Sequence, residues 1–213
     1  MHCGKQPDVQ LCVQADAGTG SSHHLAALPA RLNTALAFSW ENSASAVMNE
    51  IRTLGDTLLP LLNPEAVARL NSGIEIPDTF PLELRHLYSW RNGEKWEDMF
   101  NPIFNFRLMP FEECLKETAQ LKRRYPKSDI IQKGFAIGDH AYGNGSIIAI
   151  RLDSGGVELG NLIAEDGIIY CTHDGVVQLM RTTLAVWTEK GDFVEISRRF
   201  SSNVNREIEI CGD

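Results

Sequence analysis

The sequence lacks any long hydrophobic run. Its apolar clusters have the length of a strand, as in Ser146 to Ile150, and none approaches the roughly 20 residues that a membrane-spanning helix needs. The opening stretch, MHCGKQPDVQ, has neither the basic part nor the apolar part of a secretory signal. We therefore expect a cytoplasmic protein that makes no contact with a membrane.

Positive charge is also scarce. Lys and Arg number 20 against 28 Asp and Glu, which gives a formal net charge of −8. Nucleic-acid binding needs a basic footprint, so we expect no nucleic-acid partner. The acidity suits a basic protein partner, such as a basic toxin domain, because opposite fields speed encounter. Acidic proteins are common, however, and solubility alone is the more frequent reason for such a charge.

Cysteines are few, and their number is odd. The five cysteines are widely spaced along the chain, which argues against a disulfide framework and favours reduced thiols. Their spacing to the histidines matches no zinc pattern. We therefore predict no metal site and no cofactor.

The common catalytic motifs are missing: there is no G-x-S-x-G, H-E-x-x-H, C-x-x-C or Walker A sequence. The most enzyme-like residues are Asp139 and His140, which could form an acid–base or metal pair, and Cys171 with His173, which would share one face of a strand. Geometry rather than residue type defines such sites, so we predict no catalytic residue. A small hydrolase or metal-dependent enzyme that uses Asp139, His140 and His173 remains the alternative.

Three regions differ in composition. Residues 1–40 are Gly- and Ser-rich without periodicity, which predicts a flexible extension. Residues 41–191 contain the periodic segments and form the predicted domain. Residues 192–213 form a tail whose pattern fits either a short helix or a strand, and which could belong to the domain.

The first part of the domain is predicted to be helical. Apolar residues recur every three or four positions up to Pro60, which should end the first helix. Asn63 is a suitable N-cap for a short second helix that would end at Gly73. The apolar residues of the first helix are Val47, Ile51, Leu54 and Leu58.

A third helix is predicted within IPDTFPLELRHLYSWRNG. Asp78 is a suitable N-cap, and the pair Asn92-Gly93 should stop the helix because both residues tolerate a positive φ. The buried face should consist of Leu84, Leu87 and Tyr88.

The second part of the domain is rich in strands. Further helices are expected from Pro110 to Arg124 and from Val177 to about Gly191. Turn residues separate the strands, which favours an antiparallel meander. The fold class is therefore α+β, with an antiparallel sheet of about four to six strands and helices packed mainly on one side. The predicted strands are Pro102 to Leu108, Gly134 to Gly138, Ser146 to Leu152, Gly156 to Ile163 and Gly167 to His173.

Three phrases in this order resemble the SMI1/KNR4 family, also called the SUKH superfamily. They are Ile76-Pro77 before a helix with Tyr88 and Asn92-Gly93, then FNFRLMPFEECL, then FAIGDHAYGNGSIIAIRLDSGGVEL. The resemblance covers about Ser43 to Gly191. It implies a single α+β domain that binds other proteins, either as an immunity-type protein that neutralises a toxin or as a regulatory scaffold of the cell-wall and signalling type. The family offers no catalytic residues to transfer.

Binding residues are predicted where aromatic and acidic side chains meet. Trp96 lies among acidic residues and would be an exposed contact, or would fold back over the helix end. The basic stretch Leu121 to Lys127 is either a solvated helix end that complements the helix dipole or a site for an anionic ligand. The predicted binding residues are Trp90, Glu94, Trp96, Glu97, Asp98, Asp139 and Tyr142.

Overall fold

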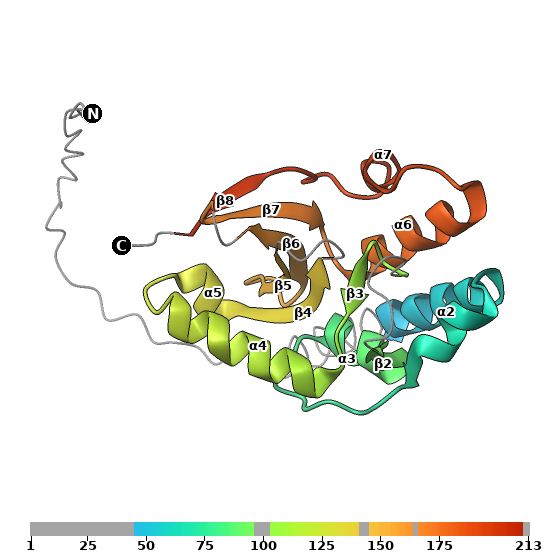
Figure 1. Cartoon of the computed structure of the whole chain (residues 1–213), viewed down its shortest axis with the longest axis horizontal. Coiled ribbons are helices and arrows are strands. Elements are labelled where there is room, and N and C mark those ends of the chain that lie inside the picture. The colour runs from blue at the N-terminus through green and yellow to red at the C-terminus, as the bar shows by residue number, and fades with distance from the viewer. Residues whose placement is uncertain (1–44, 96–102, 141–144, 164–165, 211–213) are drawn as a thin grey trace, which may run out of the picture. The chain divides into compact units, whose positions relative to one another are not determined.

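The computed structural model describes residues 45–95, 103–140, 145–163 and 166–210 of the 213-residue chain (Figure 1). Within these ranges no helix is both long enough and apolar enough to cross a lipid bilayer. The predicted extension, residues 1–40, lies outside the described residues.

The main sheet has six antiparallel strands in sequence order, from β3 to β8 (Figure 1). Each strand pairs with the next along the chain, so the predicted meander and the α+β class are confirmed. The sixth strand comes from the predicted tail, where Ile208 pairs with Ile169. The strands are β3 (Phe106–Leu108), β4 (Gly134–His140), β5 (Ser146–Arg151), β6 (Val157–Ile163), β7 (Ile168–His173) and β8 (Glu207–Glu209).

Helices pack against this sheet. The helix α4 runs beside β4, and α6 contacts β6, β7 and α3 (Figure 1). The tail also contains a helix, α7, so it holds both of the elements that its pattern allowed. The helices are residues 45–58, η1 (Leu59–Leu61), α2 (Pro64–Arg69), α3 (Leu82–Trp90), α4 (Phe111–Arg124), α5 (Asp129–Lys133), α6 (Val176–Glu189) and α7 (Phe193–Ser197).

The predicted apolar faces form the core. Leu84, Leu87 and Tyr88 are fully buried, as predicted for the third helix. The buried Tyr88 hydroxyl lies 2.9 Å from the Cys114 sulfur and donates to the Met109 carbonyl at 3.2 Å. These contacts join α3 to the start of α4, because a buried hydroxyl needs a polar partner.

The predicted start of the third helix was wrong. The helix begins at Leu82 rather than after Asp78. Phe80 precedes a proline, and such a residue is sterically disfavoured in the helical conformation, so the turn from Pro77 to Phe80 stays outside the helix. The Asp78 carboxylate instead forms an ion pair with Arg85 at 2.5 Å.

The predicted ends of the second and third helices were also wrong. The helix α2 ends at Arg69, and β1 (Leu70–Ser72) follows where a helix up to Gly73 was expected. The helix α3 ends at Trp90, and β2 (Arg91–Glu94) pairs with β1. The pairing of β1 with β2 therefore replaced the last residues predicted for α2, and it ended α3 just before the predicted stop.

The Asn92-Gly93 pair anchors the start of α4 rather than stopping a helix. Gly93 has a φ of 72°, and a Cβ there would lie 2.4 Å from the Pro110 nitrogen. The Asn92 side-chain oxygen accepts a hydrogen bond from the Phe111 amide at 2.8 Å. Only glycine permits both this backbone conformation and this close approach.

Candidate functional site

Trp90 is a core residue. Its side chain is only 7% exposed, and its ring packs edge-on against Phe104 with 6.4 Å between centroids. A Cβ on Gly55 would lie 2.4 Å from the Trp90 ring, so this glycine makes room for the indole. Its burial argues against Trp90 as a contact for a partner.

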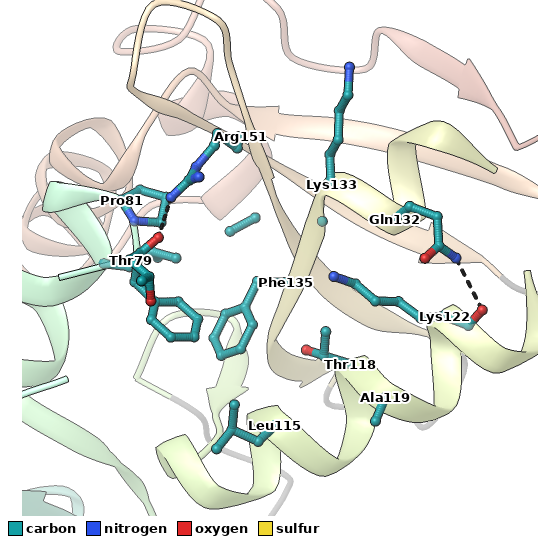
Figure 2. A pocket seen from close by; sticks show the side chains of 14 residues that line it. Thr79, Pro81, Leu115, Thr118, Ala119, Lys122, Gln132, Lys133, Phe135 and Arg151 are labelled. Carbon is teal, nitrogen blue, oxygen red and sulfur yellow. Dashed lines mark hydrogen bonds between the residues drawn. The ribbon is translucent and has the colours of Figure 1, made fainter. Parts of the chain in front are cut away.

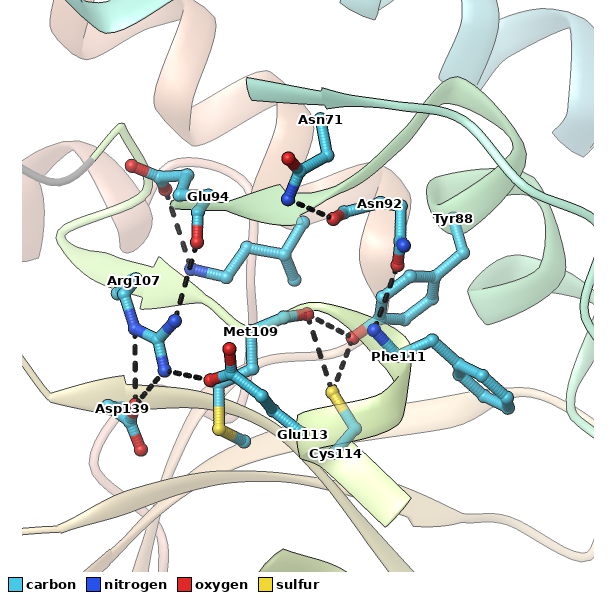
Figure 3. Close-up of polar contacts among 11 residues, drawn as sticks. Asn71, Tyr88, Asn92, Glu94, Arg107, Met109, Phe111, Glu113, Cys114 and Asp139 are labelled. Carbon is cyan, nitrogen blue, oxygen red and sulfur yellow. Dashed lines mark hydrogen bonds and ion pairs between the residues drawn. The ribbon is translucent and has the colours of Figure 1, made fainter. Parts of the chain in front are cut away.

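Two other predicted binding residues meet at a buried arginine (Figure 3). The Arg107 guanidinium, with 4% of its side chain exposed, donates to Asp139 and to Glu113, each at 2.6 Å. It also donates to the Glu94 carbonyl at 3.3 Å. We call Arg107, Glu94, Glu113 and Asp139 the Arg107 cluster. It joins β2, β3, α4 and β4 by charge-assisted hydrogen bonds.

Glu94 was expected in an outward-facing acidic loop, and the structure corrects this. It is 2% exposed, and its carboxylate accepts from the Leu108 amide at 3.4 Å. Burial raises the pKa of Glu94 to about 7, although the Leu108 amide and the nearby Arg69 and Arg107 lower it in part. Glu94 therefore exchanges a proton near neutral pH from inside the protein.

The other predicted binding residues, Trp96, Glu97, Asp98 and Tyr142, lie outside the described residues. The prediction that they contact a partner stays a prediction.

The enzyme-like residues lie in separate settings. Asp139 pairs with Arg107, and the backbone of His140 pairs with Phe106 in the neighbouring strand. His173 is 2% exposed, and its Nε2 lies 3.3 Å from the Thr182 hydroxyl. Burial lowers the pKa of His173 to about 4, so its imidazole is neutral at physiological pH.

Cys171 and His173 share the buried face of β7, as the strand pattern predicted. Burial raises the pKa of the Cys171 thiol to about 12, which leaves it protonated and weakly nucleophilic. The Asp174 carboxylate accepts from the Ser202 amide at 2.7 Å. Among the described residues, no group of three or more His, Cys, Asp and Glu side chains is arranged to hold a metal ion.

An open groove that sequence reasoning missed lies among the described residues (Figure 2). It has a volume of about 460 Å³ and lies between the loop before α3, one face of α4, α5, and the strands β4 and β5. A second cavity of about 530 Å³ adjoins it and shares Phe80, Pro81, Lys133 and Arg151 with it. We call the first cavity the groove.

One wall of the groove is a single face of α4. Leu115, Thr118, Ala119 and Lys122 follow one another at steps of three, one and three residues, which places them on one side of a helix. The Thr118 hydroxyl accepts from the Ala136 amide at 2.9 Å and fixes this wall to β4. Leu115 is 45% exposed, a large exposure for an aliphatic side chain.

The floor of the groove is aromatic. Phe80 packs edge-on against Phe135 with 4.8 Å between ring centroids, and Phe111 lies behind both rings at 5.2 and 5.8 Å. Ala149 is the cross-strand partner of Phe135, so the two side chains share a face of the sheet. The small alanine methyl leaves depth above the floor.

The rim of the groove is positively charged. Lys122, Lys133 and Arg151 line it, and the described lining residues include no acidic side chain. In Figure 2 the Lys122 ammonium extends toward Phe135, whereas the Lys133 side chain extends away from that ring. The Arg151 guanidinium donates to the Thr79 carbonyl, which holds the loop before α3 against β5. Neither lysine ammonium has an ion-pair or hydrogen-bond partner among the described residues.

One wall of the groove could have been identified from the sequence. Lys122 belongs to the basic stretch for which an anionic ligand was one interpretation, and the spacing from Leu115 to Lys122 was readable as two helical turns. Lys133 and Arg151 gave no signal, because α5 and β5 bring them to the same place only in the folded chain.

The chain was compared with protein-family models and with curated proteins. No protein-family model matches the chain, and no curated protein gives a significant match. The resemblance to the SMI1/KNR4 family therefore stays a prediction that rests on the quoted phrases.

Proposed function

We propose that this protein is a binding domain that recognises another protein by surface complementarity. Its leading form is an immunity-type protein that works in the cytosol and neutralises a toxin by binding it. The supporting observation is the groove, where an aromatic floor and the 45% exposed Leu115 lie beside two lysines without partners among the described residues. Apolar contacts surrounded by polar rims are the usual composition of a protein interface.

Several features of the groove favour binding over a purely structural role. Single exposed apolar side chains are common, and Val67 and Val194 are nearly as exposed as Leu115. Leu115 differs from them because it lines one cavity together with Phe80 and Phe135. The surrounding backbone is well fixed, because Thr118 bonds to β4 and Gln132 donates to the carbonyls of Lys122 and Tyr125, each at 3.1 Å. A rigid surface loses little entropy when a partner binds.

The test is co-expression of the chain with each protein encoded beside its gene, toxins first. We expect a complex that survives gel filtration, and cell growth that is restored when the partner is toxic. If no neighbouring product forms a complex, the proposed function is wrong. A complex that leaves toxicity unchanged would keep the binding function and favour the regulatory scaffold.

A matched pair of variants links the complex to the groove. Leu115→Ser removes an exposed leucine from the groove, and Val67→Ser removes an apolar side chain of similar exposure, 40%, from α2. We expect Leu115→Ser to weaken the complex about tenfold, since apolar contact residues contribute on the order of 1 kcal/mol or more. Val67→Ser should leave the affinity unchanged.

A further inference from the structure

We infer that the groove binds an acidic segment of the partner in an extended conformation, with one bulky apolar side chain on the aromatic floor and carboxylates at the basic rim. This inference rests on the proposed function and specifies the chemistry that the partner must present. It differs from what the net charge alone suggests, because the protein is acidic overall while the groove is basic.

The floor selects for an apolar side chain. Phe80 and Phe135 present ring surface, and Leu115 adds an aliphatic wall. No charged group lies on this floor among the described lining residues, so a charged side chain placed there would lose hydration without gaining a partner. A leucine or phenylalanine of the ligand would instead gain the hydrophobic energy of burial.

The rim selects for negative charge. The ammonium groups of Lys122 and Lys133 have no described partner to displace, so a ligand carboxylate can pair with them at no cost to the fold. Arg85 differs from these two lysines, because it lines the adjoining cavity but is already paired with Asp78. The charge preference of the site therefore comes from the two lysines and Arg151.

The shape favours an extended segment over a compact small molecule. The groove is open and borders the second cavity, whose own lining adds Asp78 and Asp153, so an acidic segment would lie in the groove rather than in that cavity. Small-molecule sites usually surround their ligand and place polar groups inside, whereas the polar groups here lie at the rim. An extended chain alternates its side chains, so an apolar residue can point to the floor while its acidic neighbours point to the rim.

The experiment measures fluorescence anisotropy of the fluorescein-labelled peptide Glu-Asp-Leu-Asp-Glu with the full chain. We expect this peptide to bind and its affinity to fall as salt rises, because screening weakens exposed charge pairs. Two control peptides should not bind: one with lysines in place of the acids, and one with serine in place of the leucine. Equal binding of either control would overturn the inference.

Variants locate the binding. The double variant Lys122→Glu with Lys133→Glu should weaken peptide binding about tenfold, from two lost ion pairs and two added repulsions. Lys116→Glu is the matched control, since Lys116 is exposed on the same helix but does not line the groove. Leu115→Ser serves as a second groove variant that keeps the charge. If both groove variants bind the peptide like the parent chain, the site is elsewhere and the inference is wrong.

Two further probes test other ligand classes. Oleate and vesicles of phosphatidylserine with phosphatidylcholine also combine apolar and negative groups. If either binds at the groove and the acidic peptide does not, the inference is overturned in favour of a lipid ligand. A partner complex that survives both groove variants would also overturn it while leaving the binding function intact; the absence of any complex would instead count against the function.

Discussion

The Arg107 cluster and the groove lie beside the same strand, β4, and share the helix α4. They differ in whether their basic side chains are paired with acidic side chains of the fold. Arg107 is 4% exposed and has both Asp139 and Glu113 at 2.6 Å, so its charge is compensated within the fold. Lys122 on α4 and Lys133 on α5 have no described partner for their ammonium groups. Glu113 and Leu115, two residues apart on α4, point to the two regions.

The difference indicates which charges serve the fold and which are available to a ligand. A buried charge must be paired, because its desolvation costs several kcal/mol. A lysine at the rim of the groove keeps its hydration, so its ammonium group needs no partner within the fold. It can therefore pair with a carboxylate of a ligand. The sequence-based prediction placed Glu94 and Asp139 on a binding surface, whereas the structure buries Glu94 and pairs Asp139 with Arg107.

The largest effect should come from breaking the cluster. Arg107→Ala removes a side chain that is 4% exposed, which opens a cavity and leaves the Glu94 carbonyl and the Asp139 carboxylate without their shared donor, so the free energy of unfolding should fall by about 4 kcal/mol. Urea denaturation measures the change. Arg181→Ala is the control: it removes an exposed pair with Glu50 and should cost less than about 1 kcal/mol. Equal losses in the two variants would mean that the cluster is no more structural than a surface pair.

A smaller effect should be a dependence of the free energy of unfolding on pH, caused by the titration of Glu94. The folded protein holds the Glu94 proton up to about pH 7, whereas the unfolded chain releases it near the ordinary value of 4.5. The unfolded state therefore binds fewer protons between these values, and Glu94 should lower the free energy of unfolding as pH rises through this window, by up to about 3 kcal/mol.

The variant Glu94→Gln tests this dependence, because glutamine resembles the protonated carboxyl and does not titrate. Urea denaturation at several pH values should show a flatter profile and a higher stability at pH 8 than for the parent chain. A profile that keeps the same slope in the variant would assign the pH dependence to another group.

The smallest effect should come from the groove. Lys122→Glu with Lys133→Glu should change the free energy of unfolding by less than about 1 kcal/mol, most of it from placing a negative charge in the last turn of α4. Thermal unfolding beside the Lys116→Glu variant checks this. A loss as large as that of Arg107→Ala would show that the groove lysines support the fold, and the distinction between the two regions would disappear.

The elements with strong periodicity were predictable from the sequence. The helix from Phe111 to Arg124 follows Pro110 with acids in its first turn and bases in its last, and the structure has this arrangement. The four strands from β4 to β7 also lie where turn residues separate apolar runs. The predicted strand from Pro102 is shorter in the structure and begins at Phe106, directly after Asn105 with a φ of 61°.

The candidate site was predictable only in fragments. Lys122 stood out in a basic stretch, but Phe80, Phe135 and Arg151 come from three other elements. Arg107 gave no signal in the sequence, since its acidic partners follow 6 and 32 residues later. Local spacing contains no information about such distant pairs.

By itself the sequence determined the class of the fold and the order of its strands, because the period of apolar residues fixes which elements can bury a face. Only the tertiary structure decided the function of the charged residues. Whether an acid or a base is paired depends on side chains that distant segments bring within a few ångströms, as Arg107 does for Asp139. The same assembly left Lys122 and Lys133 beside an aromatic floor with no described partner, and that arrangement is the physical basis of the proposed binding site.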